Sequence, residues 1–100
     1  MIIIGQASWP SESTQEMGRR FKRLSALPPY LIGRDYIKAV EGVGVKVISV
    51  YHCEQGRLIE ALDVCQKRYA EFFGVAGFSF SVDIWSEVQD ALELIGLAGE

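Results

Sequence analysis

The sequence predicts an α+β domain, in which four strands form one antiparallel sheet and helices connect or follow them. Four segments are rich in β-branched or alternating apolar residues, which is typical of strands. Three others space their apolar residues three or four positions apart, as on one face of a helix. The two kinds follow one another as strand, helix, strand, strand, helix, strand, helix. A chain of 100 residues has the size of one domain, so residues 1–100 are interpreted as a single unit.

The first strand and helix occupy the N-terminal quarter of the chain. Residues 2–9 begin with three isoleucines and predict a strand. Ser13 and Glu16 have the spacing of a capping box, which marks the start of a helix. The proline pair at 28–29 cannot continue that helix. Its buried face is expected to comprise Met17, Phe21 and Leu24.

A hairpin and the clearest amphipathic helix follow. Residues 30–40 and 45–53 predict two strands, and the glycines of the turn at 41–44 can take the positive φ that a hairpin needs. A helix is expected from about residue 55 to Phe73, because charged residues lie opposite an apolar stripe. The stripe consists of Leu58, Leu62, Cys65, Tyr69 and Phe72.

The last strand and the last helix are shorter. Residues 78–84 alternate apolar side chains with serine and aspartate, which indicates a half-buried strand. Ser86 and Gln89 predict a helix cap, and Gly96 predicts the helix end with Leu97 folded back. The inward residues of this helix are expected to be Val88, Leu92 and Ile95.

Composition excludes several classes of protein. Ten basic and 13 acidic residues give a net charge of −3, which argues against non-specific nucleic-acid binding. No apolar run reaches the length of a membrane span, and the N-terminus lacks the pattern of a signal peptide. One histidine and two cysteines are too few for a metal site within one subunit. We therefore expect a cytoplasmic protein without metal, cofactor, nucleic-acid or membrane partner.

The order of elements is that of a ferredoxin-like fold with an extra C-terminal helix. Right-handed crossovers place both long helices on one face of a sheet ordered 4-1-3-2. The two central strands are apolar on both faces, whereas the edge strands keep a polar face. Because helices cover only one face, the other would be an exposed apolar patch. A second copy of the same sheet is its simplest cover, so we expect a homodimer.

This layout resembles the dimeric α+β barrel superfamily, in which two ferredoxin-like sheets pack face to face. The resemblance rests on element order over residues 1–85 and on the runs GVKVISVYHCEQGRLIEAL and ALELIGL. The second run looks similar to an uncharacterised branch of that superfamily. The resemblance implies a dimeric α+β barrel. Because characterised members include both cofactor-free enzymes and binding proteins, it implies no particular activity.

The candidate ligand-binding residues are polar side chains expected on the open face of the sheet. If Tyr51 faces away from the helices, one assignment places Arg34, Tyr36 and Asp83 on the same side. Arg34 could then bind a carboxylate through two hydrogen bonds. Polar groups among apolar ones are typical of a ligand pocket, but they fit the rim of a dimer interface equally well. A register slip of one residue would bring His52 there instead.

Two classes of function stay open. The first is a small dimeric domain that binds an apolar or carboxylate ligand, or a partner, between its sheets. The alternative is a cofactor-independent enzyme, monooxygenase-like or isomerase-like. No catalytic residue is assigned, because His52 lacks an evident orienting group and nothing nearby would activate Cys53. Cys65 is expected in the core, and the basic run at 19–23 on a solvated helix face.

Overall fold

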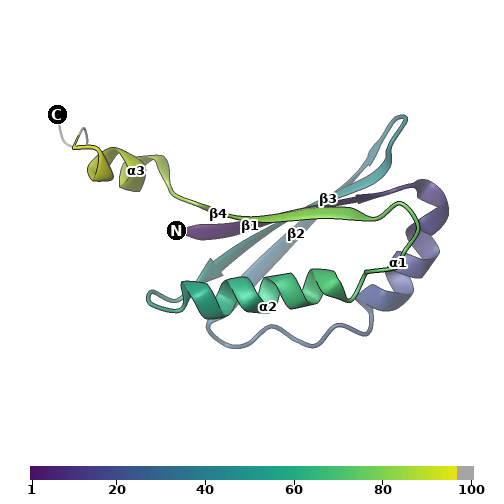
Figure 1. Ribbon diagram of the computed structural model, residues 1–100, viewed down its shortest axis with the longest axis horizontal. Coiled ribbons are helices and arrows are strands. Elements are labelled where there is room, and N and C mark those ends of the chain that lie inside the picture. Colours follow the sequence, from purple (N-terminus) through teal and green to yellow (C-terminus); the bar gives the residue numbers. More distant parts are fainter. Residues whose placement is uncertain (97–100) are drawn as a thin grey trace.

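The computed structural model describes residues 1–96 and shows one sheet with both longer helices on the same side (Figure 1). The strands are β1 (Ile2–Trp9), β2 (Leu31–Val40), β3 (Gly44–Cys53) and β4 (Ser79–Trp85). A 3₁₀ turn, Ser11–Ser13, leads into α1 (Thr14–Phe21), and α2 (Leu58–Ala70) connects β3 to β4. The last helix, α3 (Val88–Leu94), projects beyond the end of the sheet.

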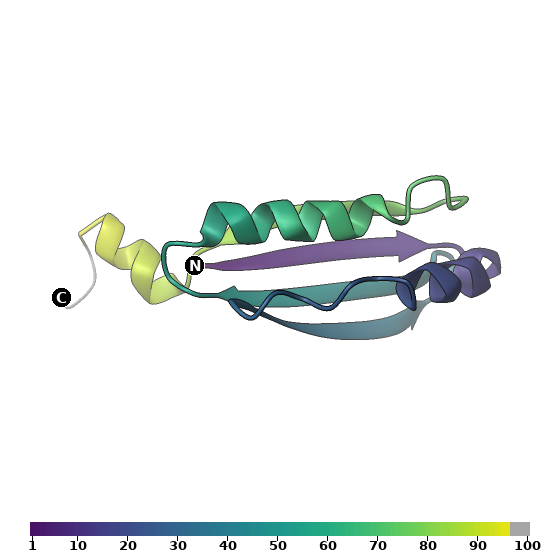
Figure 2. The ribbon, with the colours of Figure 1, turned by 90° about the horizontal axis from the view of Figure 1, so that it is seen from below.

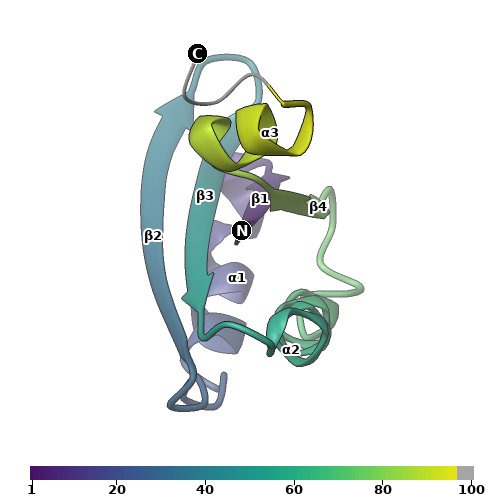
Figure 3. The same ribbon diagram turned by 90° about the vertical axis from the view of Figure 1, so that its left-hand side faces the viewer.

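All strand pairs are antiparallel, and the hydrogen-bonded order is β2-β3-β1-β4. The prediction of an α+β domain with a four-stranded antiparallel sheet is confirmed. The arrangement fits a ferredoxin-like fold at this coarse level. Figure 3 views the layers nearly along β1, with β2 and β3 curving past the helices.

The strand register decides which side chains face the helices. Gly5 pairs with Ser49 on one side and Val82 on the other, and Ser49 pairs with Asp35. Because directly paired residues point to the same face, alternate positions divide into two sets. The helix-facing set includes Ile3, Ala7, Trp9, Asp35, Ile37, Val47, Ser49 and Tyr51. The opposite, open face carries Ile4, Arg34, Tyr36, Ile48, Val50, His52 and Asp83.

Helix α2 packs on the covered face of the sheet. Its predicted stripe is confirmed at Cys65 and Tyr69, which are buried. Phe72 is buried too, but it lies beyond the end of α2 at Ala70, so the predicted helix end at Phe73 is wrong. At one end of the sheet Tyr69 and Phe72 pack with Trp9 and Met17. At the other end Cys65 packs with a second group of buried residues: Ile3, Leu31, Tyr51 and Ala61.

Helix α1 is shorter than predicted and is not held by a capping box. The Ser13 hydroxyl donates to the carbonyl of Ala76 at 2.6 Å instead of capping the helix. The Glu16 carboxylate pairs with Arg19 at 2.7 Å and with Arg20 at 2.9 Å, so it does not reach back to Ser13. The helix ends at Phe21, well before the proline pair.

Helix α3 also departs from its predicted packing. Its N-cap is Glu87 and lacks a side-chain cap bond, so the expected cap at Ser86 is wrong. Val88 and Ile95 are exposed, not inward, because the helix projects away from the sheet (Figure 1). The predicted contact of Leu97 lies outside the described residues.

The helices leave part of the inner sheet face uncovered. Eight residues make α1 only about 12 Å long. Beneath the gap, β2 lies at the edge of the sheet, and Ile37 on its helix-facing side stays 69% exposed. Figure 2 shows α2 over β1 and the irregular segment after α1 running along the β2 side. Together these elements enclose a hollow between the helix layer and the sheet.

Candidate functional site

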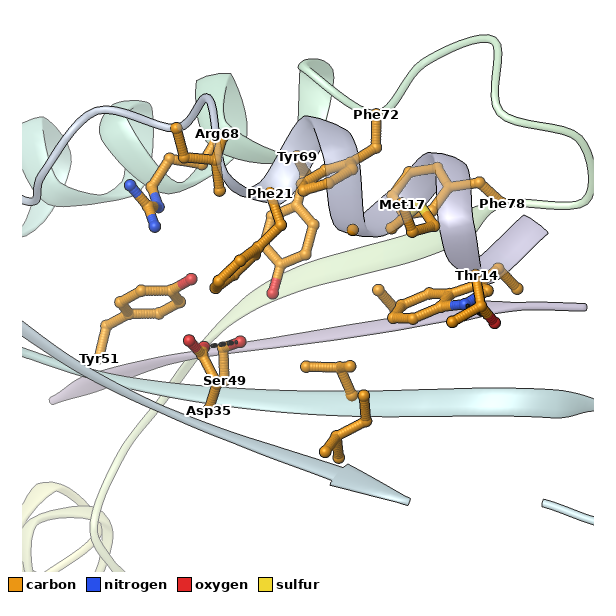
Figure 4. Close-up of a pocket in the computed structure, with 16 residues that line it drawn as sticks. Thr14, Met17, Phe21, Asp35, Ser49, Tyr51, Arg68, Tyr69, Phe72 and Phe78 are labelled. Atoms are coloured by element: carbon orange, nitrogen blue, oxygen red, sulfur yellow. Dashed lines mark hydrogen bonds between the residues drawn. The ribbon is translucent and has the colours of Figure 1, made fainter. Parts of the chain in front are cut away.

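A cavity of about 370 Å³ occupies this hollow. Most of its wall is apolar, and aromatic rings from four elements contribute to it (Figure 4). Trp9 and Met17 line one end together with Phe72 and Phe78. The volume falls within the range of small-molecule pockets, and a mainly apolar wall with few polar groups is their usual composition.

The other end of the cavity is polar. The Ser49 hydroxyl donates a hydrogen bond of 2.5 Å to the Asp35 carboxylate. The hydroxyls of Tyr51 and Tyr69 point toward this pair, as Figure 4 shows. Three hydroxyls and one carboxylate therefore meet where the apolar wall ends. Such a polar end can orient a bound molecule whose body occupies the aromatic part.

At this end, Tyr69 has a hydroxyl that lacks the hydrogen bond that a buried polar atom normally makes. Its side chain is only 6% exposed, and its hydroxyl has no hydrogen-bond partner within the described residues. A buried hydroxyl without a partner destabilises the folded state, so such atoms need an explanation. A ligand group in the cavity would provide the missing partner.

Both phenols are held in the neutral form. Burial raises the pKa of Tyr51, and the nearby Ser49 hydroxyl lowers it by less. Burial also raises the pKa of Tyr69, where the nearby Ser49 hydroxyl again lowers it by less and the neighbouring Tyr51 raises it. The negative charge of Asp35 adds to the increase in both pKa values. Both hydroxyls thus keep their protons at neutral pH and can donate hydrogen bonds.

The rim of the cavity is formed by α1, α2 and the segment between α1 and β2. Phe21 lines the cavity although it is 55% exposed, so the prediction that it is buried in the core is wrong. Arg68 of α2 also lines it and donates to the carbonyl of Ser25 at 2.6 Å. This bond ties the segment after α1 to α2 and leaves a positive charge at the rim.

The predicted ligand-binding residues do not share one face. Tyr51 pairs with Gly33, so it lies on the helix side and not on the open face. Arg34, Tyr36 and Asp83 do lie on the open face. The error is one residue in the relative register of the neighbouring strands, which moves a side chain to the opposite face. Of the four residues, only Tyr51 lines the cavity.

His52 and Cys53 also differ from their expected positions. His52 is near the end of β3, as predicted, but it is exposed on the open face, the same face as Arg34, and so is not outside that set. Cys53 is half-buried on the helix side, and neither cysteine forms a disulfide. Among residues 1–96, no three histidine, cysteine, aspartate or glutamate side chains gather as metal ligands would.

Asp35, Ser49 and Tyr69 are site residues that the sequence prediction assigned to other places or omitted. Two strand glycines could have indicated the positions of Tyr69 and Tyr51. A β-carbon on Gly5 would overlap the Tyr69 hydroxyl, and one on Gly33 would crowd the Tyr51 ring. Glycine inside a strand often marks a close approach from another group. These two glycines therefore leave room for the two phenols.

Comparisons with known proteins identify no family. No family model and no curated protein matches this chain. Among solved structures, the de novo designed protein Foldit4 is similar, with a TM-score of 0.49 and 14% sequence identity. The match covers 86% of this chain and 94% of Foldit4. Membership of the dimeric α+β barrel superfamily stays a prediction.

In the described part of the chain, no helix has the length and apolar character that crossing a membrane would require.

Proposed function

We propose that this domain binds a small, largely apolar molecule in the cavity between its helices and its sheet. The buried, unpartnered hydroxyl of Tyr69 at the polar end of the cavity carries the proposal. A domain of this size is only marginally stable, and an unsatisfied buried hydroxyl reduces that stability. Hydrogen bonding to a ligand would explain why the protein has a hydroxyl at this position despite its cost in stability. The location differs from the one expected from sequence, which was between two sheets.

Binding of ethylbenzene, observed by ligand-detected NMR and by thermal shift, tests this proposal. A bound molecule stabilises the folded protein by mass action. We expect ethylbenzene to raise the melting temperature of the wild type and to lose this effect in Val47→Trp, which fills the cavity. Ile59→Trp is the matched control, because Ile59 is 84% exposed on α2. Equal stabilisation of both variants would contradict binding in the cavity.

Cofactor-independent catalysis at the same site is the second candidate. The observation that favours it is a carboxylate, Asp35, placed beside two neutral phenols. A carboxylate can accept a proton from carbon next to a carbonyl while a phenol hydrogen-bonds the carbonyl oxygen. Deuterium exchange into the methyl group of acetophenone tests this. Faster exchange with wild type than with Asp35→Asn supports catalysis, and equal rates contradict it.

A second copy of this chain is the partner that we propose for the open face of the sheet. Ile32 is 66% exposed there and Tyr36 57% exposed. The radius of gyration is 15.7 Å, against about 13 Å for a compact domain of 100 residues. An elongated chain with an exposed apolar sheet face is better explained as one half of an assembly.

Sedimentation velocity tests the dimer. Ile48→Asp introduces a charge into the open face and is expected to give a folded monomer, because an unpaired charge in an interface is costly. Ile59→Asp, on the outer side of α2, should leave the dimer intact. A wild type that sediments as a monomer at micromolar concentration would contradict the proposal.

A further inference from the structure

We infer that the ligand of the cavity is a neutral hydroxyl compound with an aromatic or alicyclic body, such as a phenol or an arylalkyl alcohol. This inference rests on the proposed ligand-binding function and specifies the chemical class. The free hydrogen-bonding groups at the polar end and the charges near it favour this class.

The free hydrogen-bonding groups at the polar end are complementary to a ligand atom that both accepts and donates a hydrogen bond. The Tyr69 hydroxyl is buried and unpartnered, and it keeps its proton because burial raises its pKa. It can donate to a ligand oxygen. The Ser49 proton is already directed to Asp35, so this pair offers only acceptor lone pairs. A ligand hydroxyl would accept from Tyr69 and donate to the pair formed by Ser49 and Asp35.

The neighbouring groups disfavour a charged headgroup of either sign. A carboxylate would lie against the Asp35 carboxylate, whose charge already raises the pKa of both phenols. Part of the donor capacity of Arg68, which could attract a carboxylate, is committed to the Ser25 carbonyl at 2.6 Å. An ammonium group would be attracted by Asp35, but it has no lone pair to accept the hydrogen bond that Tyr69 can donate, and it would share the cavity with Arg68. A neutral hydroxyl has neither disadvantage.

The rest of the wall selects the body of the molecule. Aromatic side chains dominate it, and rings of this kind prefer the offset or edge-on contacts that another ring provides. Phe78 and Phe80 are stacked with their centroids 5.7 Å apart, and Phe80 stacks on Tyr69 at 5.2 Å. Phe80 does not itself line the cavity, but its stacking supports the Tyr69 ring that carries the hydroxyl.

Four compounds with nearly the same body separate these alternatives: ethylbenzene, 2-phenylethanol, 2-phenylethylamine and phenylacetate. Isothermal titration or ligand-detected NMR gives their affinities for the wild type. One or two good hydrogen bonds should make 2-phenylethanol bind about tenfold more tightly than ethylbenzene. The amine and the acid should bind no more tightly than ethylbenzene.

Two variants test which residues cause this preference. Tyr69→Phe should reduce the affinity for 2-phenylethanol to that for ethylbenzene, while the affinity for ethylbenzene is retained. Asp35→Asn should selectively increase the affinity for phenylacetate, because it removes the repelling charge. Circular dichroism checks that both variants fold.

The possible failures are distinguishable. If ethylbenzene binds but phenylacetate binds most tightly to the wild type, the inferred hydroxyl class is overturned and the proposed function stands. The same holds if the advantage of 2-phenylethanol survives Tyr69→Phe. If none of the four compounds binds, the proposed function is overturned and this inference with it.

Discussion

At the scale of single residues, Tyr69 combines a stabilising ring with a destabilising hydroxyl. The ring packs in the core and stacks on Phe80 at 5.2 Å. The hydroxyl is buried without a partner and lies against Gly5. The two parts of one side chain therefore have opposite effects on the free energy of unfolding, and substitutions can separate them.

Tyr69→Phe is expected to stabilise the ligand-free protein by about 1 kcal/mol, because it removes an unsatisfied buried hydroxyl and keeps the ring. Urea unfolding followed by circular dichroism measures the change. Tyr51→Phe is the control, since the Tyr51 hydroxyl is not among the fully enclosed, unpartnered atoms. A clear loss of stability in Tyr69→Phe would show that its hydroxyl has a partner in the folded protein.

Two glycine-to-alanine substitutions should have opposite signs. Gly5→Ala forces a methyl group into the Tyr69 hydroxyl and is expected to cost about 1–3 kcal/mol, as overpacking does. Gly18 lies in α1 with open space around it, so Gly18→Ala should stabilise by about 1 kcal/mol. Chemical denaturation measures both. Similar effects of the two substitutions would be incompatible with the packing of Tyr69 on β1.

The stability of the protein is expected to decrease above about pH 9. Burial raises the pKa of the Cys65 thiol from 9.0 to about 11, so the folded state retains a proton that the unfolded state releases. Raising the pH between these values therefore favours unfolding, by about 3 kcal/mol once the pH exceeds both. Tyr51 and Tyr69 act in the same direction, because their pKa values are also raised. Urea unfolding as a function of pH measures this, and Cys65→Ala should give a shallower decrease.

At the scale of secondary-structure elements, Arg20 fixes the short helix α1 to the end of α2. Its guanidinium donates to the carbonyl of Phe73 at 2.6 Å and to that of Glu71 at 3.2 Å. It also pairs with Glu16 on its own helix at 2.9 Å. Glu71 is the C-cap of α2, where the negative end of the helix dipole favours a cation. The basic run is thus not only a solvated face.

Arg20→Ala is expected to destabilise the protein by about 1–2 kcal/mol, because several charge-assisted hydrogen bonds between two elements are lost. Arg19→Ala is the matched control. Within residues 1–96 Arg19 pairs only with Glu16, and its side chain is 58% exposed, so its loss should cost less than about 0.5 kcal/mol. Thermal or urea unfolding measures both. Equal losses of stability in Arg20→Ala and Arg19→Ala would mean that the hydrogen bonds from Arg20 to the end of α2 do not stabilise the protein.

At the scale of the whole molecule, the chain is extended and α3 stands apart. The principal extents are 51 × 31 × 18 Å, and α3 projects along the longest of them (Figure 1). Val88 is 76% exposed and Ile95 67% exposed, so these two side chains of α3 are not buried against the sheet. Isolated helices this short are marginal in water, so α3 is expected to contribute little to the stability of the rest of the domain.

Removal of residues 87–100 is therefore expected to leave the sheet and the two longer helices folded. In the Ile48→Asp background, which is expected to be monomeric, the free energy of unfolding should change by less than about 0.5 kcal/mol, as for surface changes. The radius of gyration from small-angle scattering should decrease. Global unfolding of the shortened chain would contradict the separate position of α3.

The sequence by itself determined the class of fold, the positions of the strands and the stripe of α2. These depend on local patterns, because the periods of 2 and 3.6 residues are set by backbone geometry. Only the tertiary structure decided that Tyr51 and Ser49 face the helices, that α1 ends at Phe21, and that a cavity remains beneath it. Each depends on how neighbouring strands align and how much of a sheet a helix covers. A register shift of one residue reverses every side chain of a strand and leaves its sequence pattern unchanged.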